Sequence, residues 1–126
     1  MRLITPKKQA DGLGGVNTGP HHWWLQRVTA VALIPLSLWL AFAVASHAGR
    51  DYASTKAWLS QPVTTLLLVL WLSVAVYHAS LGLQVVLEDY IQHPLIRVAT
   101  LVSIKLVLTL LGALSVVSCL RVAFAA

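Results

Sequence analysis

Three long apolar tracts, each nearly free of charge, constrain this chain more than any other feature. No Asp, Glu, Lys or Arg occurs in residues 28–49 or 57–87, and Lys105 is the only such residue in 98–120. Each tract reaches the roughly 20 residues that an α-helix needs to cross the hydrocarbon core of a bilayer. Backbone groups in lipid must be hydrogen-bonded within the segment, and tracts of this length achieve this as helices. The sequence therefore predicts an all-α fold with three transmembrane helices.

The composition agrees with a membrane protein and excludes two other classes. Of 126 residues, 58% are hydrophobic and only 10% are charged, whereas a water-soluble domain needs far more charged surface. The formal net charge is +5. However, the basic residues are scattered near the ends of the apolar tracts instead of gathering on one soluble face, which argues against nucleic-acid binding.

The apolar tracts and their breaks give an expected layout for one membrane-anchor domain that covers residues 1–126. Residues 1–20 are rich in Gly, Pro and polar groups, so they are expected to be irregular or held by a partner. The helices are expected at about 25–47, 62–89 and 95–122.

Positive charges near the tracts predict the orientation in the membrane. The N-terminal segment and the second connection carry a basic excess, formed by Arg2, Lys7, Lys8, Arg27 and Arg97. Cytoplasmic segments of membrane proteins are enriched in Lys and Arg. The N-terminus is therefore expected inside and the C-terminus outside.

One histidine stands near the middle of the second tract. Residues with spacings of 7, 4, 3 and 4 share one helix face there, namely Trp71, His78, Gly82, Val85 and Asp89. His78 and Asp89 are about 16 Å apart along the axis of a helix. If Asp89 marks the inner interface, His78 lies near the bilayer midplane, where an ionisable side chain is a candidate functional residue.

The spacing alone leaves two roles open for His78. Imidazole is a normal axial ligand of haem iron, its second nitrogen is commonly oriented by a nearby acceptor, and Gly82 would leave room for a flat group. Alternatively, His78 donates a hydrogen bond between helices and Gly82 is ordinary small-residue packing.

The end of the second tract and the start of the first carry further polar candidates. Asp89 and Tyr90 are either an ordinary helix end in water or a pair that binds a quinone carbonyl and supplies its protons. Arg27 either binds a haem propionate or anchors the helix by snorkelling.

Two motifs resemble a known family. The pattern H-x5-R-x-T-A is formed by His21, Arg27, Thr29 and Ala30, and the pattern H-A-x-x-G-x-x-x-V-x-x-D-Y spans residues 78–90. With the three-helix layout, these motifs look like the hydrophobic membrane anchor subunit of succinate dehydrogenase. More narrowly, they resemble the small anchor of the cytochrome b type found in bacteria whose enzyme is similar to the mitochondrial one.

This resemblance implies a membrane subunit of a four-subunit succinate:quinone oxidoreductase, respiratory complex II, in the bacterial inner membrane. There a flavoprotein subunit oxidises succinate, an iron–sulfur subunit relays electrons to quinone, and two anchor chains form the quinone site and share one haem b. It implies no catalytic residue for succinate oxidation in this chain. In that membrane, the orientation expected from the basic residues places the N-terminus in the cytoplasm and the C-terminus in the periplasm. The implied roles are axial ligation of haem iron for His78, haem packing for Gly82, propionate binding for Arg27 and His21, and quinone binding for Tyr90 and Asp89.

The other histidines imply a partner and leave alternatives open. His21 and His22 precede the first tract, His47 ends it and His93 lies in a connection, so a second histidine ligand must come from the other anchor subunit. The alternatives are a fumarate reductase anchor, or a structural or transport membrane protein without haem that uses His78 and Lys105 as a proton path.

Overall fold

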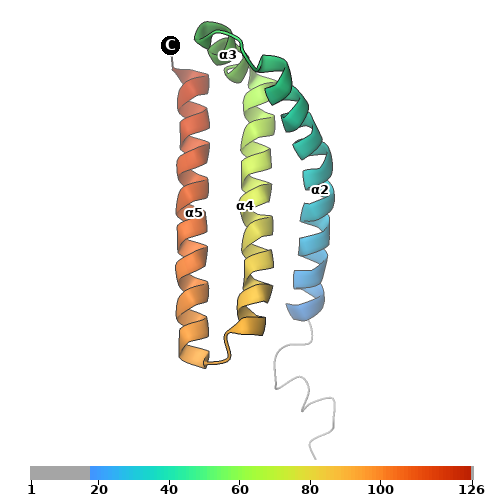
Figure 1. Cartoon of the computed structure of the whole chain (residues 1–126), viewed down its shortest axis with the longest axis vertical. Helices are drawn as coiled ribbons and strands as arrows, with labels where there is room; N and C mark the ends of the chain where they lie inside the picture. The colour runs from blue at the N-terminus through green and yellow to red at the C-terminus, as the bar shows by residue number, and fades with distance from the viewer. Residues whose placement is uncertain (1–17, 126) are drawn as a thin grey trace, which may run out of the picture.

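The computed structural model describes residues 18–125, and within that range the chain is helical with short connections. The helices are α2 (Thr18–His47), α3 (Tyr52–Leu59), α4 (Pro62–Tyr90) and α5 (Pro94–Phe124) (Figure 1). Of these, α2, α4 and α5 are long and apolar enough to cross a membrane. The predicted all-α fold with three transmembrane helices is therefore confirmed. Most of the segment expected to be irregular, residues 1–17, lies outside the described residues.

The ends of the long helices follow from their sequences, with one difference from expectation. Pro62 and Pro94 stand at the start of α4 and α5, where the missing N–H of proline leaves no helical bond unmade. The helix α2 begins at Thr18 instead of near residue 25. Because of this earlier start, His21 and His22 lie on the same helix as Arg27.

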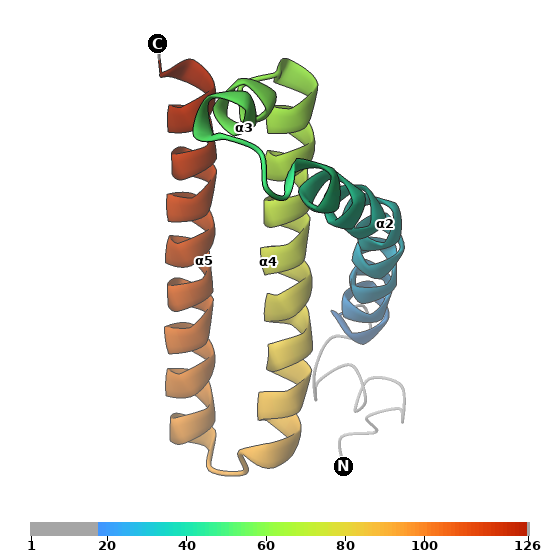
Figure 2. The same cartoon turned by 45° about the horizontal axis from the view of Figure 1, so that its top comes forward.

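The three long helices form one layer with α4 in the middle. Both views place α4 between α2 and α5 (Figures 1 and 2), and α4 contacts each of them. Very few side chains are buried: among the described apolar residues, only Ala43 and Leu81 are. The layer therefore leaves broad apolar surfaces for lipid or for other chains to cover.

The short helix α3 lies at one end of the layer, opposite the end at which α4 finishes with Tyr90 (Figure 1). Asp51 caps it by accepting a hydrogen bond of 3.2 Å from the backbone N–H of Ser54. The hydroxyl of Ser54, and then its backbone N–H, hold the pKa of the Asp51 carboxyl below its usual range. The His47 ring stacks on Trp58 with 4.1 Å between centroids, which joins α3 to the end of α2.

Candidate functional site

His78 lies on α4 at its contact with α2. Its Nδ1 atom is 2.8 Å from Oγ1 of Thr29, so the hydrogen bond between helices that the sequence left open is present. This bond occupies only one ring nitrogen. The other nitrogen, Nε2, has no hydrogen bond to any residue that the structure describes, so it is available for a second partner and the two roles considered for His78 are compatible.

An open pocket of about 540 Å³ lies beside His78, between the first turns of α2 and the second half of α4. Volumes of this order are typical of sites for small molecules and cofactors. It brings together three of the residues predicted from the sequence, namely His78, Gly82 and Arg27. The complete lining is Gly19, His22, Trp23, Gln26, Arg27, Ala30, His78, Gly82 and Val85.

Arg27 provides a positive charge in the lining of this pocket. Its Cζ atom lies 4.5 Å from the centroid of the Trp23 ring, a geometry in which the ring quadrupole attracts the cation. The Arg27 side chain is exposed, so its hydrogen-bond donors stay accessible to an anionic group in the pocket. The same position also suits an arginine at a membrane interface.

Two buried polar atoms of the lining are unsatisfied. His22 Nε2 and Gln26 Oε1 have no hydrogen-bond partner among the described residues. Buried polar atoms in folded proteins nearly always have one. A ligand, a water molecule or another chain in this pocket would supply the missing partners.

His21, which the sequence proposed for this region, does not line the pocket of His78. It lines a neighbouring pocket of about 450 Å³ that also contains Gln84 and Glu88. Within that pocket, Gln84 Nε2 donates a hydrogen bond of 2.8 Å to Glu88 Oε1. The two pockets share Gly19 and His22, the latter adjacent to His21.

Gly82 borders the pocket and has little packed against it. A Cβ atom built on it would meet only Gln26 Nε2, at 3.5 Å, which is an ordinary van der Waals contact. No neighbour among the described residues therefore requires glycine at this position, and the free volume above Gly82 is part of the pocket.

Asp89 and Tyr90 lie in the last turn of α4 and line neither of these pockets. Both are exposed, and the Tyr90 side chain is 81% exposed. The structure thus separates the proposed quinone residues from the pocket beside His78. Any site that they form must be completed by other molecules.

Several residues of the site had no predicted role, among them His22, Gln26 and Thr29. Residues 19, 22, 23, 26, 27 and 30 all line the pocket, and their spacing is that of one helix face. This spacing is visible in the sequence, but the expected helix began too late to include its first members. The contact of Thr29 with His78 joins residues 49 positions apart, and no pattern within one helix predicts it.

Comparison with known proteins identifies the family of this chain. The model of the succinate dehydrogenase/fumarate reductase transmembrane subunit family matches residues 1–118. The chain belongs to this family. The succinate dehydrogenase hydrophobic membrane anchor subunit of Rickettsia bellii is 36% identical over 98 residues, which cover 78% of each chain. That of Paracoccus denitrificans is 35% identical over 92 residues, 73% of this chain and 71% of the relative.

A more distant relative carries a similar description. The succinate dehydrogenase membrane anchor subunit of Reclinomonas americana is 27% identical over 93 residues, 71% of this chain and 78% of the relative. Membership in the family confirms the resemblance seen in the two motifs. With the three apolar helices, it makes the chain a multi-pass membrane anchor subunit of an oxidoreductase complex.

Proposed function

We propose that this chain anchors a succinate:quinone oxidoreductase to the bacterial inner membrane, co-ligates haem b through His78 and contributes to the quinone-reduction site. The observation that carries the proposal is the pocket in which His78, Gly82 and Arg27 meet. These residues lie on two different helices. Their convergence is what a shared cofactor site requires of this subunit.

The lining of the pocket suits haem b. His78 offers the free Nε2 as an iron ligand, Gly82 leaves room for a flat macrocycle, and Arg27 offers charged donors for a propionate. The unsatisfied Nε2 of His22 is a second candidate for a propionate. Bound there, haem b would supply a one-electron redox centre inside the membrane.

A second chain is needed to complete this site. The layer formed by α2, α4 and α5 leaves the pocket open. His22 is the other histidine of its lining, and it lies seven residues, about 10 Å along a helix, from the Thr29 that contacts His78. We assign the second axial ligand to a second anchor subunit that covers this face. In the complete site, low polarity would strengthen the attraction between Arg27 and an anionic propionate.

Tyr90 and Asp89 are proposed as this chain's share of the quinone site. The Tyr90 hydroxyl would donate a hydrogen bond to a quinone carbonyl, and the Asp89 carboxylate would hold water and pass protons to the reduced quinone. Both side chains are exposed at the last turn of α4. An iron–sulfur subunit and a second anchor would enclose them.

The proposed orientation puts the exposed Asp89 and Tyr90 on the cytoplasmic side of the membrane. With the N-terminus in the cytoplasm, α4 ends on the cytoplasmic side and α5 ends in the periplasm. Tyr90 and the start of α2 then lie on the side where soluble succinate-oxidising subunits bind. The basic residues of the N-terminal segment and of the second connection support this orientation.

The proposal is tested by purifying the native complex through an affinity tag on this chain. A flavoprotein, an iron–sulfur protein and a second three-helix chain should co-purify, with a reduced b-type spectrum and succinate-dependent quinone reduction. Purification of this chain with neither b-type absorbance nor quinone reductase activity would contradict the proposal. Comparing succinate oxidation with fumarate reduction in the same preparation distinguishes a fumarate reductase anchor.

A further inference from the structure

Thr29 links the imidazole of His78 to the backbone of α2. Its Oγ1 atom is 2.8 Å from His78 Nδ1, 2.7 Å from the carbonyl oxygen of Leu25 and 3.1 Å from that of Gln26. Only 9% of the Thr29 side chain is exposed. The hydroxyl group is therefore held by protein groups on three sides, with little access to solvent.

The position of the single hydroxyl proton follows from these distances. A carbonyl oxygen can only accept a hydrogen bond, whereas a histidine ring nitrogen either donates or accepts. Two oxygen atoms 2.7 Å apart need a proton between them, so the Thr29 hydroxyl donates to Leu25 O. Its lone pairs then face His78 Nδ1, and this nitrogen must be the donor of the 2.8 Å bond.

We infer that Thr29 is a positioning residue that holds neutral His78 as the Nδ1–H tautomer, with the lone pair of Nε2 free for a metal. This inference rests on the proposed function, in which Nε2 ligates haem iron. An acceptor at Nδ1–H fixes the orientation of a ligating imidazole and raises the basicity of its other nitrogen. Thr29 thus performs for His78 the task that a carbonyl or carboxylate performs in many metal sites.

A second bond between the same helices keeps Thr29 opposite His78. Trp71 Nε1 donates a hydrogen bond of 3.0 Å to Ser37 Oγ. Trp71 precedes His78 by seven residues and Ser37 follows Thr29 by eight, as expected for antiparallel helices in one register. The pairing of Thr29 with His78 is therefore built into the packing of α2 on α4.

The test compares Thr29→Val with Thr29→Ser in the purified complex. Valine keeps the shape of threonine and removes the hydroxyl, while serine keeps the hydroxyl. The readouts are the haem midpoint potential, the electron paramagnetic resonance g-values of the ferric haem, and the haem-to-flavin ratio. Loss of the acceptor weakens electron donation by imidazole to ferric iron, so Thr29→Val should raise the potential, shift the g-values and lower haem affinity about 10-fold or more.

Thr29→Ser should stay close to the wild type in all three measurements. Wild-type potential, g-values and haem content in Thr29→Val would overturn the inference, and so would equal changes in both variants. If Thr29→Val prevents assembly, Thr29→Ala takes its place in the comparison with serine. The variant His78→Leu distinguishes failure of the proposed function from failure of the inference about Thr29. A wild-type haem content in His78→Leu refutes the proposed function. Loss of haem in His78→Leu, together with wild-type potential, g-values and haem content in Thr29→Val, refutes only the inference.

Discussion

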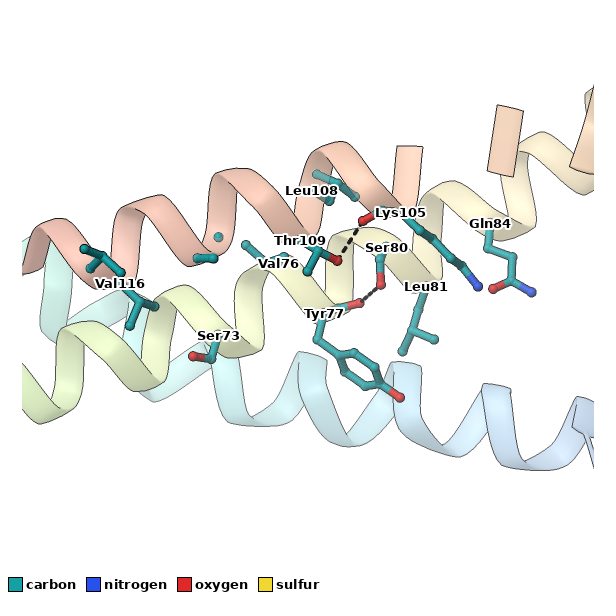
Figure 3. A pocket seen from close by; sticks show the side chains of 13 residues that line it. Ser73, Val76, Tyr77, Ser80, Leu81, Gln84, Lys105, Leu108, Thr109 and Val116 are labelled. Atoms are coloured by element: carbon teal, nitrogen blue, oxygen red, sulfur yellow. Dashed lines mark hydrogen bonds between the residues drawn. The ribbon is translucent and has the colours of Figure 1, made fainter. Parts of the chain in front are cut away.

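Gly112 lies so close to Val76 that a methyl group on the glycine would be 3.2 Å from Val76 Cγ2 and 3.3 Å from Cγ1. Both residues line a groove of about 710 Å³ between α4 and α5, shown in Figure 3 with Val76 labelled. The absence of a side chain allows the two helices to approach closely here. Such small-residue contacts are typical of helix packing in membranes.

A leucine at Gly112 should therefore destabilise the packing of α5 on α4. The leucine Cβ would already lie 3.2 Å from Val76 Cγ2, and the rest of its side chain adds bulk at this contact. Overpacking of this kind costs about 1–3 kcal/mol. We expect a lower midpoint of thermal inactivation for the complex with Gly112→Leu. Gly112→Ala is the control: Val76 need shift by only tenths of an ångström, and alanine favours the helix by about 0.5–1 kcal/mol. Equal midpoints of thermal inactivation for Gly112→Leu and the wild type would contradict the proposed close contact between Gly112 and Val76.

Gly82 should behave differently, because the space above it belongs to the pocket and not to helix packing. Gly82→Leu should leave α4 intact but place a side chain where the macrocycle is proposed to bind. The expected result is a several-fold lower haem-to-flavin ratio in an assembled complex. Ala79→Leu, outside the pocket lining, is the matched control and should keep its haem. A full haem complement in Gly82→Leu would exclude Gly82 from the haem site.

Tyr90→Phe tests the proposed hydrogen bond to quinone, since it removes one hydroxyl and little volume. A lost hydrogen bond of this kind costs about 0.5–1.5 kcal/mol, so the rate of succinate–quinone reduction should fall several-fold. Haem content and succinate–dye activity should stay unchanged. Tyr52→Phe is the matched control, because Tyr52 is similarly exposed, at 82%, on the opposite end of the layer. Wild-type quinone kinetics in Tyr90→Phe would show that Tyr90 is only an interfacial anchor.

Lys105 is expected to bind lipid phosphate and not to carry protons. In Figure 3 its side chain runs along the groove between α4 and α5 toward Gln84, and so toward the cytoplasmic end in the proposed orientation. A lysine near an anionic surface contributes about 1 kcal/mol of attraction. Lys105→Met should retain less anionic lipid, measured on the purified complex, while quinone turnover stays normal. Collapse of turnover with full haem content and normal assembly would instead support a proton path through Lys105.

The transmembrane helices could be predicted because backbone groups in lipid must be hydrogen-bonded within the chain, and long apolar segments achieve this as helices. The apolar tracts, nearly free of charge, predicted the three spans, and Pro62 and Pro94 marked the starts of α4 and α5. The predicted start of α2, near residue 25, was wrong. Gly19 and Pro20 are typical helix breakers, and they favoured a later start in the prediction. In the first turn of a helix, however, proline removes no backbone bond, so α2 extends back to Thr18.

The candidate site was predictable within one helix and not between helices. The spacing of His78, Gly82 and Val85 placed them on one face of α4, and they do line one pocket. Asp89 shares that face, but it is about 16 Å farther along the axis than His78 and does not line this pocket. The partners from α2 depend on how that helix rotates and slides against α4, and a single sequence does not contain this information.

The ligation of haem by His78 is the central claim, and the visible spectrum of the His78→Leu complex tests it most directly. His93→Leu is the control, since His93 precedes α5 and its side chain makes no capping bond. If His78 is the ligand, His78→Leu loses or strongly alters the reduced b-type spectrum and keeps succinate–dye activity in the soluble subunits, while His93→Leu keeps both. An unchanged b-type spectrum in an assembled His78→Leu complex would contradict the claim.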